Sequence, residues 1–505
     1  MQTQALLEDK FQKFGNKPAI IFQDQAISFA ELKTRVFKLA AGLQALGVKK
    51  GDRVAIFLPN WPEYIYSYLS LFTLGTIVVP LDFMLTDEEV TNFLNHSESS
   101  VLIAKEKKGV DFKQIKNKCP WLKKIVLLKE EGSSSIQEEG FVSWQDLANS
   151  TANFIAEEIS ETDYSSIFYT SGSTGHPKGV LLTYAHQDNP IICLRHFIQP
   201  NDKDSFLNGG LPFSHVAGLD YMLFMLNFGA TLVLMERFHP LEFLRNLEKY
   251  KVTIFCIVPA MFVAILSLKE CEKFDLSALH YPVVFGAPSS PDLLRKFQQL
   301  CPNANLLNGW GMTETAAPNT LSPPDITKIN SIGPFGAGME AKIVDDNSKT
   351  LSVGEKGELW VKGKAVMVGY YKEKELTDEV LTVDGWLKTG DIAMFDKAGL
   401  FYIVGRKKEM IKVSGEIVYA PEVEEALYKN PAVAEAAVIG VPDEVRGEAV
   451  KAFIVLKSGA SLDQDGVRYF LRSHLAHFKI PHEVEFRQNL PKNRTGKIDK
   501  ELLKR

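Results

Sequence analysis

The most distinctive stretch of the chain runs from residue 169 to residue 180 and reads Tyr169-Thr170-Ser171-Gly172-Ser173-Thr174-Gly175-His176-Pro177-Lys178-Gly179-Val180. It follows the apolar pair Ile167-Phe168, which is typical of the end of a buried strand. Three glycines and four serine or threonine residues accompany a single lysine. Small residues let backbone N–H groups approach phosphate oxygens closely, hydroxyl groups add donors, and the lysine adds a positive charge. The stretch therefore predicts a loop that binds a polyphosphate.

Two other interpretations of this loop are weaker. A P-loop needs the pattern G-x-x-x-x-G-K-[ST], but counting from Gly172 places Pro177 at the second glycine, and Gly179 follows the lysine. A purely structural loop is the usual interpretation of a short Gly/Ser cluster. A stretch as long and as specific as this one favours phosphate binding instead.

Outward from the loop, the first part of the chain alternates helical and strand patterns. Ser28 and Glu31 form a capping box ahead of a helix whose apolar positions recur three and four residues apart. A strand over residues 54–58, a helix over 61–74 and a buried strand over 76–81 follow in turn. This alternation predicts an α/β fold in which helices cover mixed or parallel sheets.

The chain has 505 residues, more than one hydrophobic core usually organises, so two or more domains are expected. The composition changes near the charged junction Gly405-Arg406-Lys407-Lys408-Glu409, beyond which a helix begins around Pro421. Two strand-like runs, 434–441 and 449–455, and a helix from residue 463 to about 476 follow. We predict a large domain over residues 1–404 and a small α+β domain over residues 405–505.

Charge and cysteine content narrow the class of protein. The formal net charge is -5, so no general attraction draws the chain to nucleic acid, and we expect no such partner. The five cysteines are scattered and form no C-x-x-C pair, as expected for reduced thiols. The first residues lack the organisation of a secretory signal, and the most apolar stretches are too short to span a bilayer. We therefore predict a cytoplasmic protein.

Six ordered motifs give the chain a family resemblance. The loop at 169–180 is similar to the phosphate-binding signature of the adenylate-forming superfamily, which includes acyl-CoA synthetases, peptide-synthetase adenylation domains and luciferases. Five further segments resemble the other motifs of that superfamily in the same order, over nearly the whole chain: 211–218, 308–315, 386–391, 405–415 and 491–497. The resemblance implies a two-domain enzyme that activates a carboxylic acid with ATP.

The resemblance also implies which residues serve the triphosphate and its Mg²⁺. Lys178 would provide a charge for the phosphates, together with the small residues Thr170, Ser171, Gly172, Ser173, Thr174 and Gly175. Glu314 would bind Mg²⁺, because this ion prefers oxygen ligands, and Thr313 would be a neutral donor. Thr174 is a second candidate ligand of the metal.

A further set of residues would hold the nucleoside. Trp310 occupies the position of the ring that lies against adenine, where relatives usually have tyrosine. Asp391 resembles the aspartate that accepts hydrogen bonds from both ribose hydroxyls, and Arg406 an arginine that faces the nucleotide. The resemblance also places two groups of residues around the adenine. Gly286, Ala287 and Pro288 would lie on its other side, and Asn308, Gly309 and Gly311 would surround Trp310. Taken alone, an aspartate or an arginine would be interpreted as a solvated surface charge.

Two residues resemble groups that act on the acid. Lys497 is similar to the lysine that bridges the substrate carboxylate and the α-phosphate, where a fixed ammonium offsets the repulsion of two anions. His215 resembles the histidine beside the acyl pocket, although a hydrogen-bonded, partly buried imidazole is the other interpretation.

Similar enzymes exchange their catalytic groups by rotating the small domain between two half-reactions. Lys408 matches the hinge position. The segment from Lys412 to Gly415 would then enter the site, and Gly415 would let the pantetheine arm of coenzyme A pass close to the backbone. Lys412 is a candidate partner of the coenzyme A phosphates, and a solvated surface lysine is the other interpretation.

These resemblances imply an AMP-forming acyl-CoA synthetase that uses ATP, Mg²⁺ and coenzyme A. Segments 213–228 and 254–266 are rich in Phe, Leu, Met and Val and contain no Arg or Lys, so an apolar monocarboxylate is expected. A medium- or long-chain fatty acid is the first choice, and an aryl or cinnamate-type acid the second. Other acyl acceptors are a free carrier protein and, as in luciferases, oxygen.

A non-catalytic protein that binds ATP or a fatty acid is disfavoured, because Lys178, Glu314, Asp391 and Lys497 are all present. The expected partners are small molecules, with peripheral contact to a membrane left open, and the expected state is a monomer or a homodimer.

Overall fold

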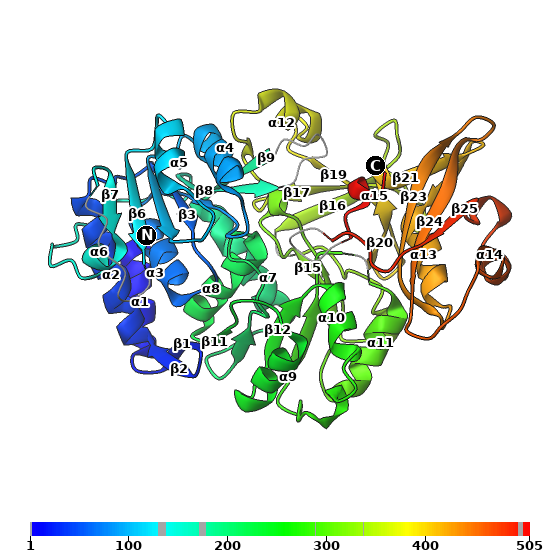
Figure 1. The fold of residues 1–505 in the computed structure, drawn as a ribbon, viewed down its shortest axis with the longest axis horizontal. Helices are drawn as coiled ribbons and strands as arrows, with labels where there is room; N and C mark the ends of the chain where they lie inside the picture. The colour runs from blue at the N-terminus through cyan, green and yellow to red at the C-terminus, as the bar shows by residue number, and fades with distance from the viewer. Residues whose placement is uncertain are drawn as a thin grey trace.

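A computed structural model describes residues 3–129, 138–170, 178–287, 289–336, 338–492 and 498–504. The described part of the chain forms two eight-stranded sheets, a four-stranded sheet and a five-stranded sheet, here called sheets 1 to 4 (Figure 1). Helices pack around the two large sheets, so the predicted α/β class is confirmed.

Sheet 1 carries the predicted phosphate loop. Its strand order is β18 (Gly369–Tyr370), β9 (Lys178–Thr183), β8 (Tyr164–Thr170), β4 (Ile77–Pro80), β3 (Arg53–Phe57), β5 (Val101–Lys105), β6 (Lys124–Leu128) and β7 (Phe141–Ser143). Strands β3 to β8 run parallel, whereas β9 and β18 are antiparallel to their neighbours. The helix α2 (Phe29–Ala45) precedes β3 in the chain, and the helices between later strands are α3 (Pro62–Thr73), α4 (Asp87–Ser97), α5 (Phe112–Lys118) and α6 (Trp144–Ala148). The predicted capping box of Ser28 and Glu31 starts α2.

Sheet 2 has a parallel centre and antiparallel edges. Its order is β15 (Thr320–Leu321), β14 (Leu307–Trp310), β13 (Tyr281–Val284), β12 (Ile254–Ile257), β10 (Ser205–Leu207), β11 (Thr231–Leu234), β1 (Pro18–Phe22) and β2 (Gln25–Ser28). Only β15 and β2, at the two edges, pair antiparallel. Its helices are α1 (Thr3–Phe14), α7 (Asn189–Phe197), α8 (Val216–Phe228), α9 (Pro240–Lys249), α10 (Pro259–Leu266) and α11 (Pro291–Leu300).

Sheets 3 and 4 meet at a short junction. Sheet 3 consists of β16 (Met339–Val344), β17 (Gly357–Gly363), β19 (Leu387–Phe395) and β20 (Phe401–Arg406), with α12 (Lys374–Val380) nearby. Sheet 4 consists of β22 (Glu416–Tyr419), β21 (Met410–Val413), β24 (Gly447–Leu456), β23 (Val433–Asp443) and β25 (Glu483–Phe486), with α13 (Ala420–Tyr428), α14 (Gln464–Arg472) and α15 (Lys500–Leu503). Between them lies the 3-10 helix η5 (Lys407–Glu409).

The hydrophobic cores follow this arrangement. One cluster of buried side chains includes Phe168 of sheet 1, Phe206 of sheet 2 and Leu359 of sheet 3. Sheet 4 has clusters of its own, around residues such as Val438 and Phe453. Helices α3 and α8, whose residues are mainly apolar or aromatic, bury nearly all of their side chains. Among the described helices, none combines the length and apolarity that crossing a membrane requires.

One C-terminal helix is shorter than predicted. The pattern predicts a helix over residues 463–476, whereas α14 ends at Arg472. The side chains of Ser473 and His474 both bind the carbonyl oxygen of Phe470, at 2.8 and 3.0 Å. Such local contacts compete with the backbone hydrogen bonds that would continue the helix.

Candidate active site

The two ends of the predicted phosphate loop are held in a strand pair. Thr170 at the end of β8 lies opposite Lys178 at the start of β9. Residues 171–177 lie outside the described part of the chain, and with them the predicted Ser171, Gly172, Ser173, Thr174 and Gly175. The ammonium nitrogen of Lys178 lies 5.0 Å from the centre of the Tyr370 ring. The pairing therefore brings one predicted donor and one predicted charge to the same end of sheet 1.

Glu314 joins this group from another element. It lies in the 3-10 helix η3 (Thr313–Thr315), and 9% of its surface is exposed. The Tyr370 hydroxyl donates a hydrogen bond to Glu314 Oε1 over 3.0 Å. Burial and the neighbouring Glu314 carboxylate raise the pKa of Tyr370, which keeps the phenol protonated as a donor. Tyr370 belongs to none of the motifs singled out in the sequence, so its part in this group is a finding of the structure.

The acidic groups near the site suit a metal that arrives with its substrate. The described residues contain no cluster of three or more His, Cys, Asp or Glu side chains that could hold a metal ion. Mg²⁺ in nucleotide-dependent enzymes is held by one or two carboxylates and by the substrate phosphates. Glu314, a single buried carboxylate near Lys178 and Tyr370, fits such an ion.

Trp310, Asp391 and Arg406 meet although they come from three strands. The Trp310 indole nitrogen donates to Asp391 Oδ2 over 2.9 Å, and Arg406 Nε lies 2.7 Å from Asp391 Oδ1. Asp391 and Arg406 are cross-strand partners on β19 and β20. Only 3% of Asp391 is exposed, and Arg406 reaches it from the surface. The two contacts hold both oxygens of the Asp391 carboxylate, so its orientation is fixed.

The small residues near Trp310 are packed tightly. A Cβ atom at Gly309 would lie 2.1 Å from the Phe285 ring, and one at Gly311 would lie 2.6 Å from the Ala317 side chain. Asn308 donates its side-chain amide to the carbonyl oxygen of Ser331, which is a structural contact. Gly286 and Ala287 follow β13, whereas Pro288 lies outside the described residues, and Thr313 is partly buried in η3.

A cleft of about 390 Å³ opens where strands of sheets 1 and 2 end. Residues after β3, β4, β10, β11 and β12 line it, and most of its wall is apolar: Leu58, Phe83, Phe213, Val258, Met261 and Ala264. The two apolar segments predicted to form the acyl pocket thus both contribute to it. Arg237 and Lys492 also line the cleft, so it is not free of positive charge as those segments alone suggest. His215 occupies the N-cap position of α8, directly after Ser214, which also lines the cleft.

The residues predicted to serve coenzyme A lie in sheet 4 and at the junction. Lys412 is an exposed residue of β21, and its backbone N–H donates to Glu448 over 2.7 Å. Gly415 occupies the turn between β21 and β22 with a φ of +88°, a conformation that favours glycine. Lys408 lies in η5, between the last strand of sheet 3 and the first of sheet 4.

Lys497 itself lies outside the described residues, but the chain on both sides of it is held firmly. Lys492 forms an ion pair with Glu435 of β23 at 2.5 Å. Lys500 forms ion pairs with Glu409 of η5 at 2.9 Å and with Glu424 of α13 at 2.8 Å. All three contacts stay within sheet 4 and the junction that leads to it.

Comparison with known proteins gives the chain a family. The model of the AMP-binding enzyme family matches residues 7–371, and that of the AMP-binding enzyme C-terminal domain matches residues 422–497. The long-chain-fatty-acid–CoA ligase of Bacillus subtilis (strain 168) is 35% identical, over 98% of this chain and 92% of its own length. 4-Coumarate–CoA ligase-like 9 of Arabidopsis thaliana is 32% identical, over 94% of this chain and 83% of its own length.

The solved structures agree with the sequence relatives. An anthranilate CoA ligase in complex with anthranoyl-AMP has a TM-score of 0.90 and 26% sequence identity, covering 100% of this chain and 96% of that one. The family match spans well over half of the chain, and two relatives exceed 30% identity over nearly its full length. The chain therefore belongs to the family of AMP-binding enzymes.

Proposed function

We propose that the protein is an AMP-forming acyl-CoA synthetase that activates a medium- or long-chain fatty acid. One observation carries this proposal. The structure brings together two sets of polar side chains that suit ATP. The first set, for the phosphates, is Lys178, Tyr370 and Glu314. The second set, for the ribose, is Trp310, Asp391 and Arg406. The apolar cleft provides space for an acyl chain. The Bacillus subtilis long-chain-fatty-acid–CoA ligase supports the choice of acid.

In the first half-reaction, a carboxylate oxygen of the acid attacks the α-phosphorus of ATP. A bond forms between that oxygen and phosphorus, and the bond to pyrophosphate breaks, which gives acyl-AMP. Bound Mg²⁺ supplies charge neutralisation at the phosphates, and Glu314 is its proposed protein ligand. Lys178 and Lys497 offset the repulsion between carboxylate and phosphate, which is the main electrostatic barrier to this step.

The nucleoside is held at the other polar group. Asp391 accepts from the ribose hydroxyls, while Trp310 and Arg406 fix the orientation of its carboxylate. Gly309 and Gly311 let Phe285 and Ala317 pack close to the backbone on either side of Trp310, which supports the position of the indole ring.

In the second half-reaction, the thiolate of coenzyme A attacks the acyl carbonyl carbon. A carbon–sulfur bond forms and AMP leaves. We propose that sheet 4 rotates about η5 between the two steps, as its separate hydrophobic core would allow. The predicted division after residue 404 lies just before the end of β20 at Arg406, and we place the hinge at Lys408. Lys412 and Gly415 would then face the pantetheine arm.

We also propose that the enzyme works in the cytoplasm. All five cysteines are free thiols, which fits a reducing cytoplasm. We propose a monomer or a homodimer that acts on small molecules. An aryl acid is the second candidate substrate, because the 4-coumarate–CoA ligase-like relative and the anthranilate CoA ligase structure resemble the chain over most of its length.

The test is acid-dependent exchange of pyrophosphate into ATP, measured with a panel of fatty and aryl acids, with and without coenzyme A. We expect exchange with fatty acids and thioester formation only when coenzyme A is added. Exchange without a thioester product would indicate a different acceptor, and no exchange with any acid would indicate a binding protein.

A variant tests the acyl cleft directly. Met261→Trp narrows the cleft, so kcat/KM for a long-chain acid should fall at least about tenfold relative to a short-chain acid, since each buried methylene affects specificity. Met394→Trp on β19 in sheet 3 is the control for a bulky substitution outside the cleft. An unchanged chain-length preference in Met261→Trp would place the acyl chain elsewhere.

A further inference from the structure

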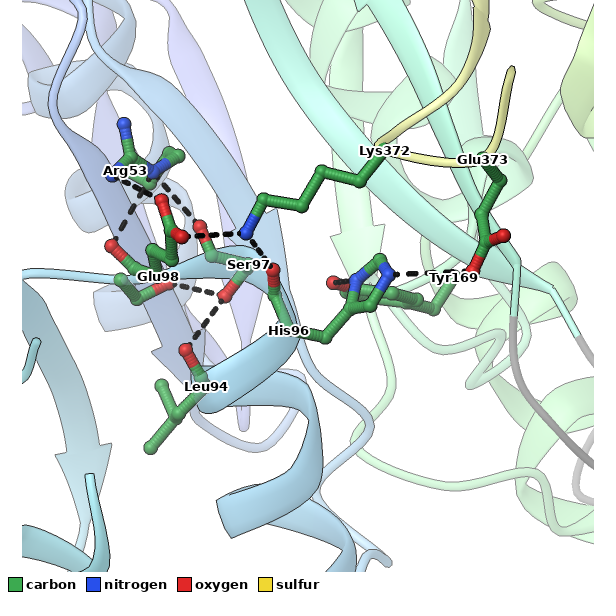
Figure 2. A network of polar contacts seen from close by, with 9 residues as sticks. Arg53, Leu94, His96, Ser97, Glu98, Tyr169, Lys372 and Glu373 are labelled. Carbon is green, nitrogen blue, oxygen red and sulfur yellow. Dashed lines mark hydrogen bonds and ion pairs between the residues drawn. The ribbon is translucent and has the colours of Figure 1, made fainter. Parts of the chain in front are cut away.

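Helix α4 ends in residues that reach toward two parts of the active site. His96 and Ser97 close the helix, and Glu98 follows in a left-handed conformation with a φ of +54°. We call His96, Ser97 and Glu98 the α4 anchor. Figure 2 shows it between Arg53 on one side and Tyr169, Lys372 and Glu373 on the other.

The first contact of the α4 anchor is with β8. His96 Nδ1 and the Tyr169 hydroxyl oxygen lie 2.7 Å apart, and the two rings meet edge to face. The Tyr169 ring also has an apolar neighbour, because the centre of the Phe93 ring lies 4.5 Å from its own centre. Tyr169 directly precedes Thr170, the last residue of β8, so this hydrogen bond holds the strand where the phosphate loop begins.

Tyr169 also fixes the strand where the loop ends. Tyr169 pairs with Gly179 across the β8–β9 ladder. A Cβ atom at Gly179 would lie 3.2 Å from Tyr169 Cε1 and 2.8 Å from a methyl carbon of Ile167, so the tyrosine ring packs directly on the glycine backbone. Gly179 follows Lys178, and the position of the ring therefore constrains the lysine.

The second contact of the α4 anchor is with the segment after β18. Lys372 Nζ lies 2.7 Å from Glu98 Oε1 and donates to the carbonyl oxygen of His96 over 3.0 Å. Glu98 is also 3.4 Å from Arg53. Lys372 lies two residues beyond Tyr370, which donates to Glu314. The α4 anchor therefore contacts both Tyr169 of β8 and the segment that follows Tyr370 (Figure 2).

The protonation states of His96 and Tyr169 decide which of them donates the hydrogen bond. Burial, and then the charge of Lys372, lower the pKa of His96, so the ring is neutral near pH 7. Burial raises the pKa of Tyr169, so its hydroxyl keeps its proton. His96 Nε2 lies 3.9 Å from Glu373 Oε1, and we assign the ring proton to Nε2, which faces this carboxylate. Nδ1 then accepts the hydrogen bond that Tyr169 donates.

We propose that His96 is a positioning residue for ATP: by accepting the Tyr169 hydroxyl, it fixes the strand ends that carry Thr170 and Lys178. The inference deepens the proposed function and rests on it for the identity of the ligand. His96 acts only through Tyr169 and takes no part in the reaction.

The experiment measures equilibrium binding of Mg·ATP to the full chain by calorimetry, which needs no turnover. His96→Leu and Tyr169→Phe should each raise the Kd about three- to tenfold, the range expected for one neutral hydrogen bond. The double variant should bind no more weakly than the weaker single variant, because both changes remove the same contact. His96→Asn places an amide oxygen near the position of Nδ1 and should restore the Kd to within about twofold of wild type.

Tyr184→Phe is the matched control. Tyr184 is buried in the same domain, and its hydroxyl donates to the carbonyl oxygen of Phe72 over 2.9 Å, in contact with neither the α4 anchor nor Tyr169. It should lower thermal stability without changing the Kd for Mg·ATP. An unchanged Kd in both His96→Leu and Tyr169→Phe, additive effects in the double variant, or an equal rise in Tyr184→Phe would overturn the inference.

The proposed function can fail separately. Normal Mg·ATP binding with no acid-dependent exchange in the wild type would refute the synthetase and leave the His96 inference to be judged by the Kd values. A wild-type chain that binds no Mg·ATP would refute both.

Discussion

The contact between Trp310 and Asp391 makes a quantitative prediction. Trp310→Phe keeps an aromatic ring at this position but removes the N–H group that donates to Asp391 Oδ2 at 2.9 Å. A hydrogen bond to a charged group contributes about 1.5 to 3 kcal/mol. Arg406 still holds the other carboxylate oxygen at 2.7 Å, so the loss should lie near the lower end. About 1.5 kcal/mol corresponds to roughly a tenfold weaker interaction with ATP.

The assay is pyrophosphate exchange at varied ATP, followed by thioester formation at varied coenzyme A. The apparent KM for ATP should rise about tenfold in Trp310→Phe, whereas the KM for coenzyme A should change less than about twofold. The reason is that Asp391 contacts the ribose of ATP in the proposed complex, whereas the residues proposed for coenzyme A, Lys412 and Gly415, lie in sheet 4.

A second tryptophan provides the control. Trp360 of β17 is as buried as Trp310, each with 7% of its surface exposed. Within the described ranges of the chain, its indole nitrogen has no hydrogen-bond partner. Trp360→Phe therefore removes the same atoms without removing a contact to a carboxylate. Equal KM values for ATP in the two variants would refute the argument that the indole N–H orients Asp391.

Two further predictions concern stability and the second half-reaction. Burial raises the pKa of Asp220 in α8 well above its ordinary 3.8, so its contribution to stability is largest in acid and declines as pH rises toward the raised value. The stability of Asp220→Asn relative to wild type should therefore increase with pH, by up to about 1.4 kcal/mol per pH unit. Thermal unfolding of both proteins at about pH 5.5 and 7.5 would measure this difference. A difference that does not change with pH would contradict the prediction. Gly415→Ala places a side chain at a φ of +88° in open space, so about 1 kcal/mol of backbone strain, and not a clash, should slow thioester formation several-fold. Single-turnover measurements of each half-reaction would check this, and an equal slowing of acyl-AMP formation would argue against a role confined to the second step.

Features that depend on neighbouring residues were predictable from the sequence. The capping box of Ser28 and Glu31 is a contact within one helical turn, and α2 begins there. The ends of strands β3 and β4 lie within one residue of the predicted ends. Each strand is a short apolar run between two helical patterns, which fixes where it can begin and end. The family motifs added site residues that no local pattern could supply.

Contacts between distant segments were not predictable. Trp310 and Asp391 are separated by 81 residues, and their hydrogen bond depends on how sheet 2 packs against sheet 3. His96 is a single histidine near the end of a polar helix, and nothing in its surroundings along the chain indicates Tyr169. Arg237 and Lys492 line the apolar cleft from segments that no hydrophobic pattern connects.

The ion pairs on both sides of residue 497 have a mechanical consequence. Lys492 is tied to β23, and Lys500 is tied to α13 and to η5 itself, so both stems of the tail move together with sheet 4. A rotation of sheet 4 about η5 would then carry the two flanking residues, Lys492 and Lys500, with it. Withdrawal of the amine that we propose for the first step and entry of the thiol would then be a single motion with one energy barrier, rather than two events that must be timed against each other.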